Sequence, residues 1–78
     1  MDKNTQMQVL DNLISMISED KARYEKESGR MEQSGDLVKS AYYDGMVIYC
    51  DTLIDRFKNE KSVIEQDLFS VRTFDGIE

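Results

Sequence analysis

The sequence lacks proline, histidine and tryptophan, and it contains a single cysteine, Cys50. One thiol cannot form a disulfide within the chain, so a covalent framework is excluded as a source of stability. Structural zinc sites are built mainly from cysteine and histidine, so the same shortage disfavours such a site. We therefore expect neither a metal nor a cofactor.

Long hydrophobic runs are also missing. Apolar runs are short, as in Met46-Val47-Ile48, whereas a helix that spans a bilayer needs about 20 apolar residues. The first residues, Met-Asp-Lys-Asn, have neither the basic nor the apolar segment of a secretory signal. We expect a cytosolic protein without membrane contact.

Positive charge is in deficit, with 10 basic against 16 acidic residues and a net charge of −6. This balance disfavours general attraction to nucleic acid or to anionic membranes, and it favours partners with a basic surface. A basic cluster does occur between Lys21 and Arg30, but glutamates and aspartate are interleaved with it. Direct binding of nucleic acid is therefore not expected.

The composition is that of one small domain covering residues 1–78, with 40% hydrophobic and 33% charged residues. A core of this size rarely supplies more than about 3 to 5 kcal/mol of net stability without a disulfide, a metal or a partner chain. Because disulfides and metals are disfavoured, oligomerisation is the expected additional source of stability.

The first half of the chain has the pattern of an amphipathic helix over about residues 5–32. Thr5 and Gln8 have the spacing of a capping box, which predicts the start of the helix. Apolar residues then recur at spacings of three, four and seven, which is the helical period. They are Leu10, Leu13, Ile14, Ile17, Tyr24 and Met31.

A turn is predicted at residues 33–36, where Ser34-Gly35-Asp36 combines a helix-ending glycine with an acidic helix starter. A second helix follows over residues 37–60 or 37–69. A second capping-box pattern at Ser62 and Glu65 leaves open a short third helix. The tail, residues 70–78, has no helical spacing and is expected to dock loosely or to fray.

The predicted inward stripe of the second helix has Cys50 and Ile54 on its edge. Its members are Val38, Tyr42, Gly45, Met46, Tyr49, Leu53 and Phe57.

The expected fold is all-α: an antiparallel helical hairpin. A turn centred between Ser34 and Gly35 places Tyr24 opposite Gly45, so that a ring packs against a position without a side chain. In the alternative, Gly45 only weakens the helix. The same register pairs Asp20 with Tyr49, Glu27 with Tyr42, Ile17 with Leu53 and Leu13 with Phe57.

Each predicted helix carries more apolar surface than one hairpin can cover. Val9 and Met16 flank the first stripe, and Leu37, Ala41 and Ile48 form a second patch. We therefore predict a homodimer, in which two hairpins form a four-helix bundle of coiled-coil type. The residues expected at helix-packing or dimer contacts are Val9, Leu10, Leu13, Met16, Ile17, Tyr24, Leu37, Tyr42, Gly45, Ile48, Tyr49, Leu53 and Phe57.

No cluster of residues indicates catalysis. Cys50 has no histidine to activate it, and its position suits an inert core thiol. Asp51 and Asp55 lie four residues apart, a spacing that allows a divalent ion, but carboxylates on an exposed helix face are usually only solvated. The sequence therefore predicts a protein that is not an enzyme.

An acidic row on the second helix, with a neighbouring tyrosine, is the candidate partner-binding surface. It consists of Tyr43, Asp44, Asp51 and Asp55. Tyrosine is frequent at interface hot spots, although the pattern favours a half-buried tyrosine at the margin of the core. The acids also admit imitation of a phosphate backbone, but solvation is their default role.

In kind, the chain resembles the small accessory proteins carried by bacteriophages and mobile elements. The resemblance is carried by its short, acidic, cysteine-poor helical pattern and by the step Tyr42-Tyr43-Asp44-Gly45. It implies a protein of the bacterial host cytoplasm that binds and blocks a larger host protein, such as a defence component. The alternatives are an assembly subunit that completes a helical bundle, and a small regulator of transcription or replication.

Overall fold

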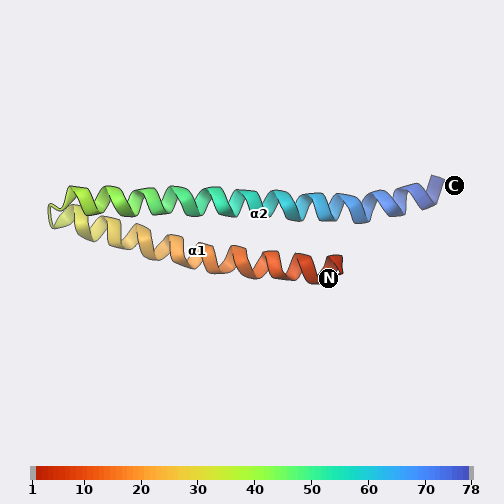
Figure 1. The fold of residues 1–78 in the computed structure, drawn as a ribbon, viewed down its shortest axis with the longest axis horizontal. Helices are drawn as coiled ribbons and strands as arrows, with labels where there is room; N and C mark the ends of the chain where they lie inside the picture. Colours follow the sequence, from red (N-terminus) through yellow and green to blue (C-terminus); the bar gives the residue numbers. More distant parts are fainter. Residues whose placement is uncertain (1, 78) are drawn as a thin grey trace.

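Two long helices joined by a short turn make up the structure. The computed structural model describes residues 2–77, with side chains described as far as residue 66. Helix α1 spans Lys3–Gln33 and helix α2 spans Leu37–Ile77. The two helices lie side by side in opposite directions (Figure 1), which confirms the predicted all-α antiparallel hairpin.

Helix α1 begins earlier than the capping-box pattern predicted. Its N-cap is Asp2, whose carboxylate accepts a hydrogen bond from the backbone N–H of Thr5 at 2.7 Å. Thr5 therefore lies inside the helix, and the start predicted at Thr5 is wrong. Aspartate is one of the strongest N-cap residues, and the hydrogen bonds from Thr5 lower the pKa of the Asp2 carboxyl.

The turn after α1 is a Schellman motif. The N–H of Asp36 donates to the carbonyl of Met31 at 2.9 Å, and the N–H of Gly35 donates to the carbonyl of Glu32 at 3.1 Å. Gly35 has a φ of 84°, a conformation that residues with a Cβ rarely adopt. Asp36 then starts α2 by accepting from the N–H of Lys39 at 3.1 Å. A hydrogen-bonded turn of three residues thus reverses the chain.

Helix α2 is longer than predicted and has no break. It runs through Ser62 without interruption, so the alternative of a separate third helix is wrong. Residues 70–77 are helical too, which corrects the expectation of a non-helical tail; Glu78 lies outside the described residues. Good helix formers such as Glu60, Lys61 and Glu65 make the capping-box pattern compatible with a helix interior. The end of α2 consequently projects beyond the start of α1 (Figure 1).

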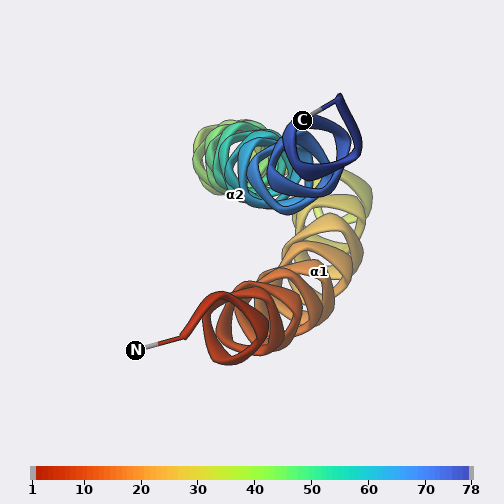
Figure 2. The same cartoon turned by 90° about the vertical axis from the view of Figure 1, so that its right-hand side faces the viewer.

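The hairpin is a rod. Its principal extents are 65 × 18 × 14 Å, and its radius of gyration is 18.3 Å, against about 11.5 Å for a compact domain of this length. Seen along the rod, α1 curves around α2 instead of running straight beside it (Figure 2). This shape leaves a single seam between two helices as the place where side chains are buried.

The seam is thinly packed. Its buried hydrophobic side chains are Leu10, Cys50 and Ile54, and among the described side chains none is completely buried. The rest of the predicted α1 stripe is half-buried: Leu13, Ile14, Ile17, Tyr24 and Met31.

Helix α2 is rotated relative to the predicted stripe. Three residues expected to face α1 are exposed: Val38 by 82%, Tyr42 by 65% and Tyr49 by 59%. Cys50 and Ile54, expected at the edge, are buried instead. At 100° per residue this is a rotation of about a quarter of a turn. Leu53 and Phe57, which belong to both arcs, are half-buried.

The rotation also removes the predicted contact between Gly45 and Tyr24. A Cβ built on Gly45 meets no atom within 4 Å, and Tyr24 stacks on Tyr43 with ring centroids 6.2 Å apart. The packing role of Gly45 inside the hairpin was therefore wrong.

The predicted pairings of Asp20 with Tyr49 and of Glu27 with Tyr42 are replaced by contacts within α1. Asp20 accepts from Arg23 at 3.0 Å, and Glu27 accepts from Arg30 at 2.7 Å. Tyr49 and Tyr42 do not reach these carboxylates, because their side chains are mostly in solvent.

Candidate interaction surfaces of the hairpin

Two ion pairs connect the helices over the part of the chain whose side chains are described. The ammonium of Lys21 lies 2.6 Å from the carboxylate of Asp51, and that of Lys61 lies 2.6 Å from Asp11. Each lysine comes from one helix and each aspartate from the other, and the pairs stand far apart along the rod. The hydrogen bonds to Asp51 and Asp11 raise the pKa of Lys21 and of Lys61, respectively. The two pairs therefore help to fix the register of α1 on α2.

The pH dependence of stability follows from these raised pKa values. A lysine whose folded-state pKa exceeds its ordinary value of 10.5 stabilises the fold fully below that pH, and this contribution is lost as pH rises through the folded-state pKa. We expect the urea midpoint to fall above about pH 10.5, as measured by circular dichroism. The double variant Lys21→Met, Lys61→Met should show a smaller fall. An identical fall in both proteins would contradict this assignment.

A third connection is a polar cluster near the turn, where Ser28 and Ser40 are both buried. The hydroxyl of Ser28 donates to the carboxylate of Asp44, and its oxygen lies 3.2 Å from the hydroxyl of Ser40. A hydroxyl has one proton, so Ser40 is the donor to Ser28 when Ser28 donates to Asp44. The small serines allow close approach of the helices while their polar atoms stay hydrogen-bonded.

Most of the predicted partner-binding surface is thus used inside the hairpin. Asp44 and Asp51 are bound to α1. Tyr43 is half-buried against Tyr24 and makes an edge contact with Tyr42, with ring centroids 5.5 Å apart. All three aspartates of the row are exposed, but for Asp55 no such bond to α1 is seen among the described residues. A role of the acidic row in binding a partner stays a prediction. Asp55 is the member of the row best placed to contact a partner.

All of these connections lie on one side of the hairpin. On α2 the carboxylates of Asp44 and Asp51 project about 100° from the line of Cys50, in one direction around the helix. Tyr42 and Tyr49 project by a similar angle in the other direction. The polar connections therefore hold one edge of α2 against α1 and leave the opposite edge uncovered.

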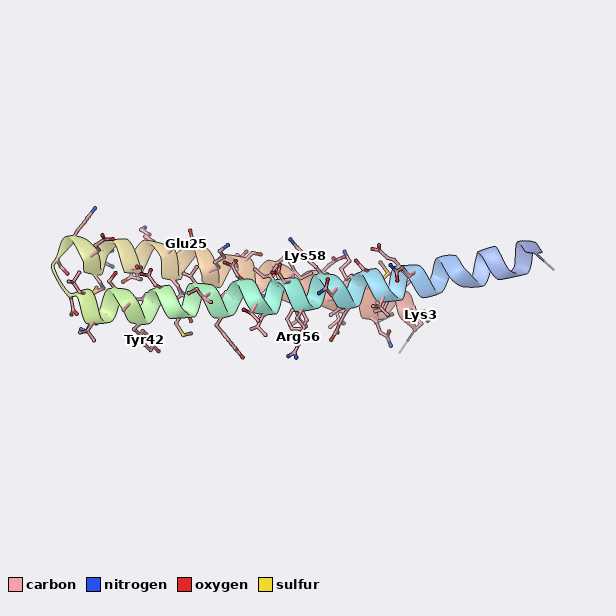
Figure 3. The ribbon with its side chains drawn as sticks, turned by 90° about the horizontal axis from the view of Figure 1, so that it is seen from above. Lys3, Glu25, Tyr42, Arg56 and Lys58 are labelled. Carbon is pink, nitrogen blue, oxygen red and sulfur yellow. The ribbon has the colours of Figure 1, made fainter. Side chains whose placement is uncertain are left out.

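The side of α2 turned away from α1 carries large apolar side chains, here called the outer face of α2. It consists of Leu37, Val38, Tyr42, Ile48 and Tyr49, which are 59 to 82% exposed. Val38, Tyr42 and Tyr49 form a row at the uncovered edge, whereas Leu37 and Ile48 project about 100° further around the helix, toward the acidic residues. Figure 3 shows Tyr42 and Arg56 projecting from α2 to the same side, so the row continues toward Arg56. The sequence reasoning placed Tyr42 and Tyr49 in the core, and only the patch of Leu37, Ala41 and Ile48 pointed to this surface.

Helix α1 contributes less exposed apolar surface. Val9 is 41% exposed and Met16 is 60% exposed. Both were predicted at helix-packing or dimer contacts, and their accessibility leaves them available for a contact outside the hairpin.

An open hollow follows the outer face toward the carboxyl end of α2. Among the described residues it is lined by Thr52, Asp55, Arg56, Asn59, Glu60, Val63 and Ile64. Acidic and basic groups alternate along it, and they do not converge on one point as the polar groups of a ligand site do.

The remaining reactive groups do not form a site. Burial raises the pKa of the Cys50 thiol, so the thiolate that would act as a nucleophile is disfavoured. Within residues whose side chains are described, no three acidic or cysteine side chains gather in a way that would hold a metal ion. The pair Asp51 and Asp55, considered for a divalent ion, has Asp51 bound to Lys21.

Over the described part of the chain, neither helix combines the length and the apolar character needed to cross a membrane. Comparison with protein-family models, with curated proteins and with solved structures finds no match for this chain.

Proposed function

We propose that this protein acts without catalysis, as a helical interaction module whose outer face of α2 packs against another protein. In the form that the resemblance to phage accessory proteins implies, it inhibits or modulates a larger host protein by occupying part of its surface. The target is then a protein that offers an apolar groove or helix to the outer face.

The observation that carries this proposal is the imbalance between buried and exposed apolar residues. Up to residue 66, three hydrophobic side chains are buried in the seam, whereas five large ones are exposed on the outer face. Burying a side chain of this size contributes about 1.5 to 3 kcal/mol. Contiguous exposed apolar surface on a small soluble protein is a mark of an interaction site.

The acidic row supports a smaller part in the same contact. Because Asp44 and Asp51 are bound to α1, their charge is not freely available to a partner. The net charge of −6 still favours a target with basic groups around the apolar contact, since such a surface speeds encounter. We therefore assign affinity to the outer face and electrostatic steering to residues such as Asp55.

Affinity capture tests whether the outer face supplies the affinity and Asp55 only the electrostatic steering. The immobilised chain is exposed to a bacterial lysate, and retained proteins are compared between wild type and Tyr49→Glu. We expect a discrete retained protein whose recovery falls at least about tenfold in the variant, because a carboxylate at the contact loses apolar burial and must be desolvated. Asp55→Asn should alter recovery by less than about threefold at physiological salt.

The matched control is Ser62→Glu, which makes the same change of charge at an exposed position of α2 that projects about 140° away from Tyr49 around the helix. It should retain the same protein as wild type. If Tyr49→Glu and wild type recover the same proteins in the same amounts, the outer face is not the binding surface.

An assembly subunit is the second candidate. The positions of Val38, Tyr42, Gly45 and Tyr49 are separated by four, three and four residues, the spacing by which one helix packs along another. On that reading the outer face fits into a permanent helical bundle instead of a reversible complex. A wild-type chain that shows no cooperative unfolding when isolated would favour it.

A further inference from the structure

We infer that α2 of a second copy covers the outer face, with the two α2 helices antiparallel and their two-fold axis passing Gly45. This inference rests on the proposed function: it names the occupant of the outer face in the isolated protein, and a target bound at that face takes the place of the second copy. The dimer expected from the sequence is thereby given a specific contact, different from the bundle built on the predicted stripes.

Gly45 is the first observation. It lies inside α2, it is exposed, and a side chain added there would meet no atom within 4 Å. Glycine weakens a helix interior relative to alanine, and nothing within the hairpin accounts for that loss. Gly29 in α1 is equally unhindered, but only Gly45 stands within a row of exposed aromatic and aliphatic side chains. A glycine at this position would allow the backbone of another helix to approach α2 closely.

The second observation is the symmetry of the row about this glycine. Tyr42 and Tyr49 lie three and four residues from Gly45 on the two sides. A two-fold axis that passes between Gly45 and Met46 sets Tyr42 of one chain against Tyr49 of the second copy, and the reverse. The rings then fill the space on either side of the glycine contact, as large and small residues alternate in facing layers.

The third observation is charge. Two chains that each carry −6 repel one another, so a contact between copies must avoid carboxylates. The row Val38, Tyr42, Gly45, Tyr49 and Thr52 has no charged member, Gly45 is at its midpoint, and Arg56 continues it. Asp44 and Asp51, which lie nearer to Leu37 and Ile48, are bound to α1. A row without carboxylates can face the same row of a second copy without bringing like charges together.

The required area is within reach of this surface. A standard interface removes roughly 800 Å² from each partner, about an eighth of the 6056 Å² that one hairpin exposes. The five residues of the outer face lie in the first half of α2 and are more than half exposed. Their ring and aliphatic surfaces supply the apolar centre of such an interface.

Sedimentation equilibrium tests the inference on the full-length chain. Wild type is expected to sediment as a dimer, twice 9.1 kDa, between about 1 and 100 µM. Gly45→Gln should weaken the dimer at least tenfold, because a long polar side chain separates the two helices. Gly29→Gln is the matched control: it makes the same change at an unhindered helix position, and it should leave the dimer intact. Circular dichroism verifies that both variants remain helical.

Oxidative cross-linking provides a second measurement that does not depend on weakening the dimer. In Gly45→Cys the two new thiols meet at the axis, so mild oxidation should link the chains within minutes. Wild type, whose Cys50 is buried, and Gly29→Cys should stay largely unlinked.

Two results overturn the inference: a wild-type monomer over the whole concentration range, or a dimer that Gly45→Gln leaves unchanged while Gly45→Cys fails to cross-link. Either result leaves the proposed function standing with a different occupant. The proposed function fails separately, through unaltered capture by Tyr49→Glu.

Discussion

Replacement of Ile54 by aspartate is expected to abolish the folded hairpin at neutral pH. Among the side chains described, Ile54 is one of three buried hydrophobic residues, so the variant loses about 1.5 to 3 kcal/mol of apolar burial. It also places a carboxylate in the seam, where the burial of an unpaired polar group adds at least about 2 kcal/mol. The sum matches or exceeds the about 3 to 5 kcal/mol that a core of this size supplies.

Urea unfolding followed by circular dichroism measures the effect. Ile54→Asp should show little helicity and no cooperative transition at about 25 °C, whereas wild type unfolds in one transition. Val63→Asp makes the same chemical change at a position of α2 that is 57% exposed, and it should cost less than about 0.5 kcal/mol. A folded Ile54→Asp chain with a midpoint close to that of Val63→Asp would show that α2 does not face α1 through Ile54.

The turn and the helical class were predictable because local chemistry decides them. Ser34-Gly35-Asp36 contains the glycine that the left-handed position of a Schellman motif needs and the acid that caps the next helix. The side of α1 that faces α2 could also be predicted, since apolar residues such as Leu10 and Ile17 alternate with charged ones.

The orientation of α2 was not predictable from hydrophobicity. Its first half is apolar on nearly all sides, with Tyr42, Ile48 and Cys50 pointing in three different directions. The apolar pattern therefore does not determine which side of α2 faces α1. Contacts between the two helices determine it. Here the pair Lys21 with Asp51 and the hydrogen bond of Ser28 to Asp44 hold one edge of α2 against α1.

The candidate surface was misassigned for the same reason. The acidic residues of α2 were recognisable as a charged row. Their partners, the ammonium of Lys21 and the hydroxyl of Ser28, lie on α1. No local sequence motif indicates that these residues are in contact. Two small polar residues, Ser28 and Ser40, were the available signal, because small residues mark places where helices approach closely. Once the acids are assigned to the seam, the tyrosines must turn outward, and the apolar face becomes the candidate site.

The second large effect is expected at the turn, from Gly35→Val. Gly35 has a φ of 84°, a conformation that costs an L-residue about 1 to 2 kcal/mol and a β-branched residue still more. We expect a loss of at least about 2 kcal/mol, which lowers the melting temperature by about 8 to 16 °C for a domain of this size. Thermal unfolding by circular dichroism measures this shift.

The control is Gly29→Val, in which the glycine lies within α1, has an ordinary helical φ and meets no atom that a Cβ would displace. Valine is a better helix former than glycine, so this variant should melt at the wild-type temperature or slightly above it. The two variants have the same composition and differ only in backbone conformation at the substituted residue. Equal melting temperatures would therefore mean that the left-handed turn at Gly35 does not hold the two helices together, and the hairpin itself would be in question.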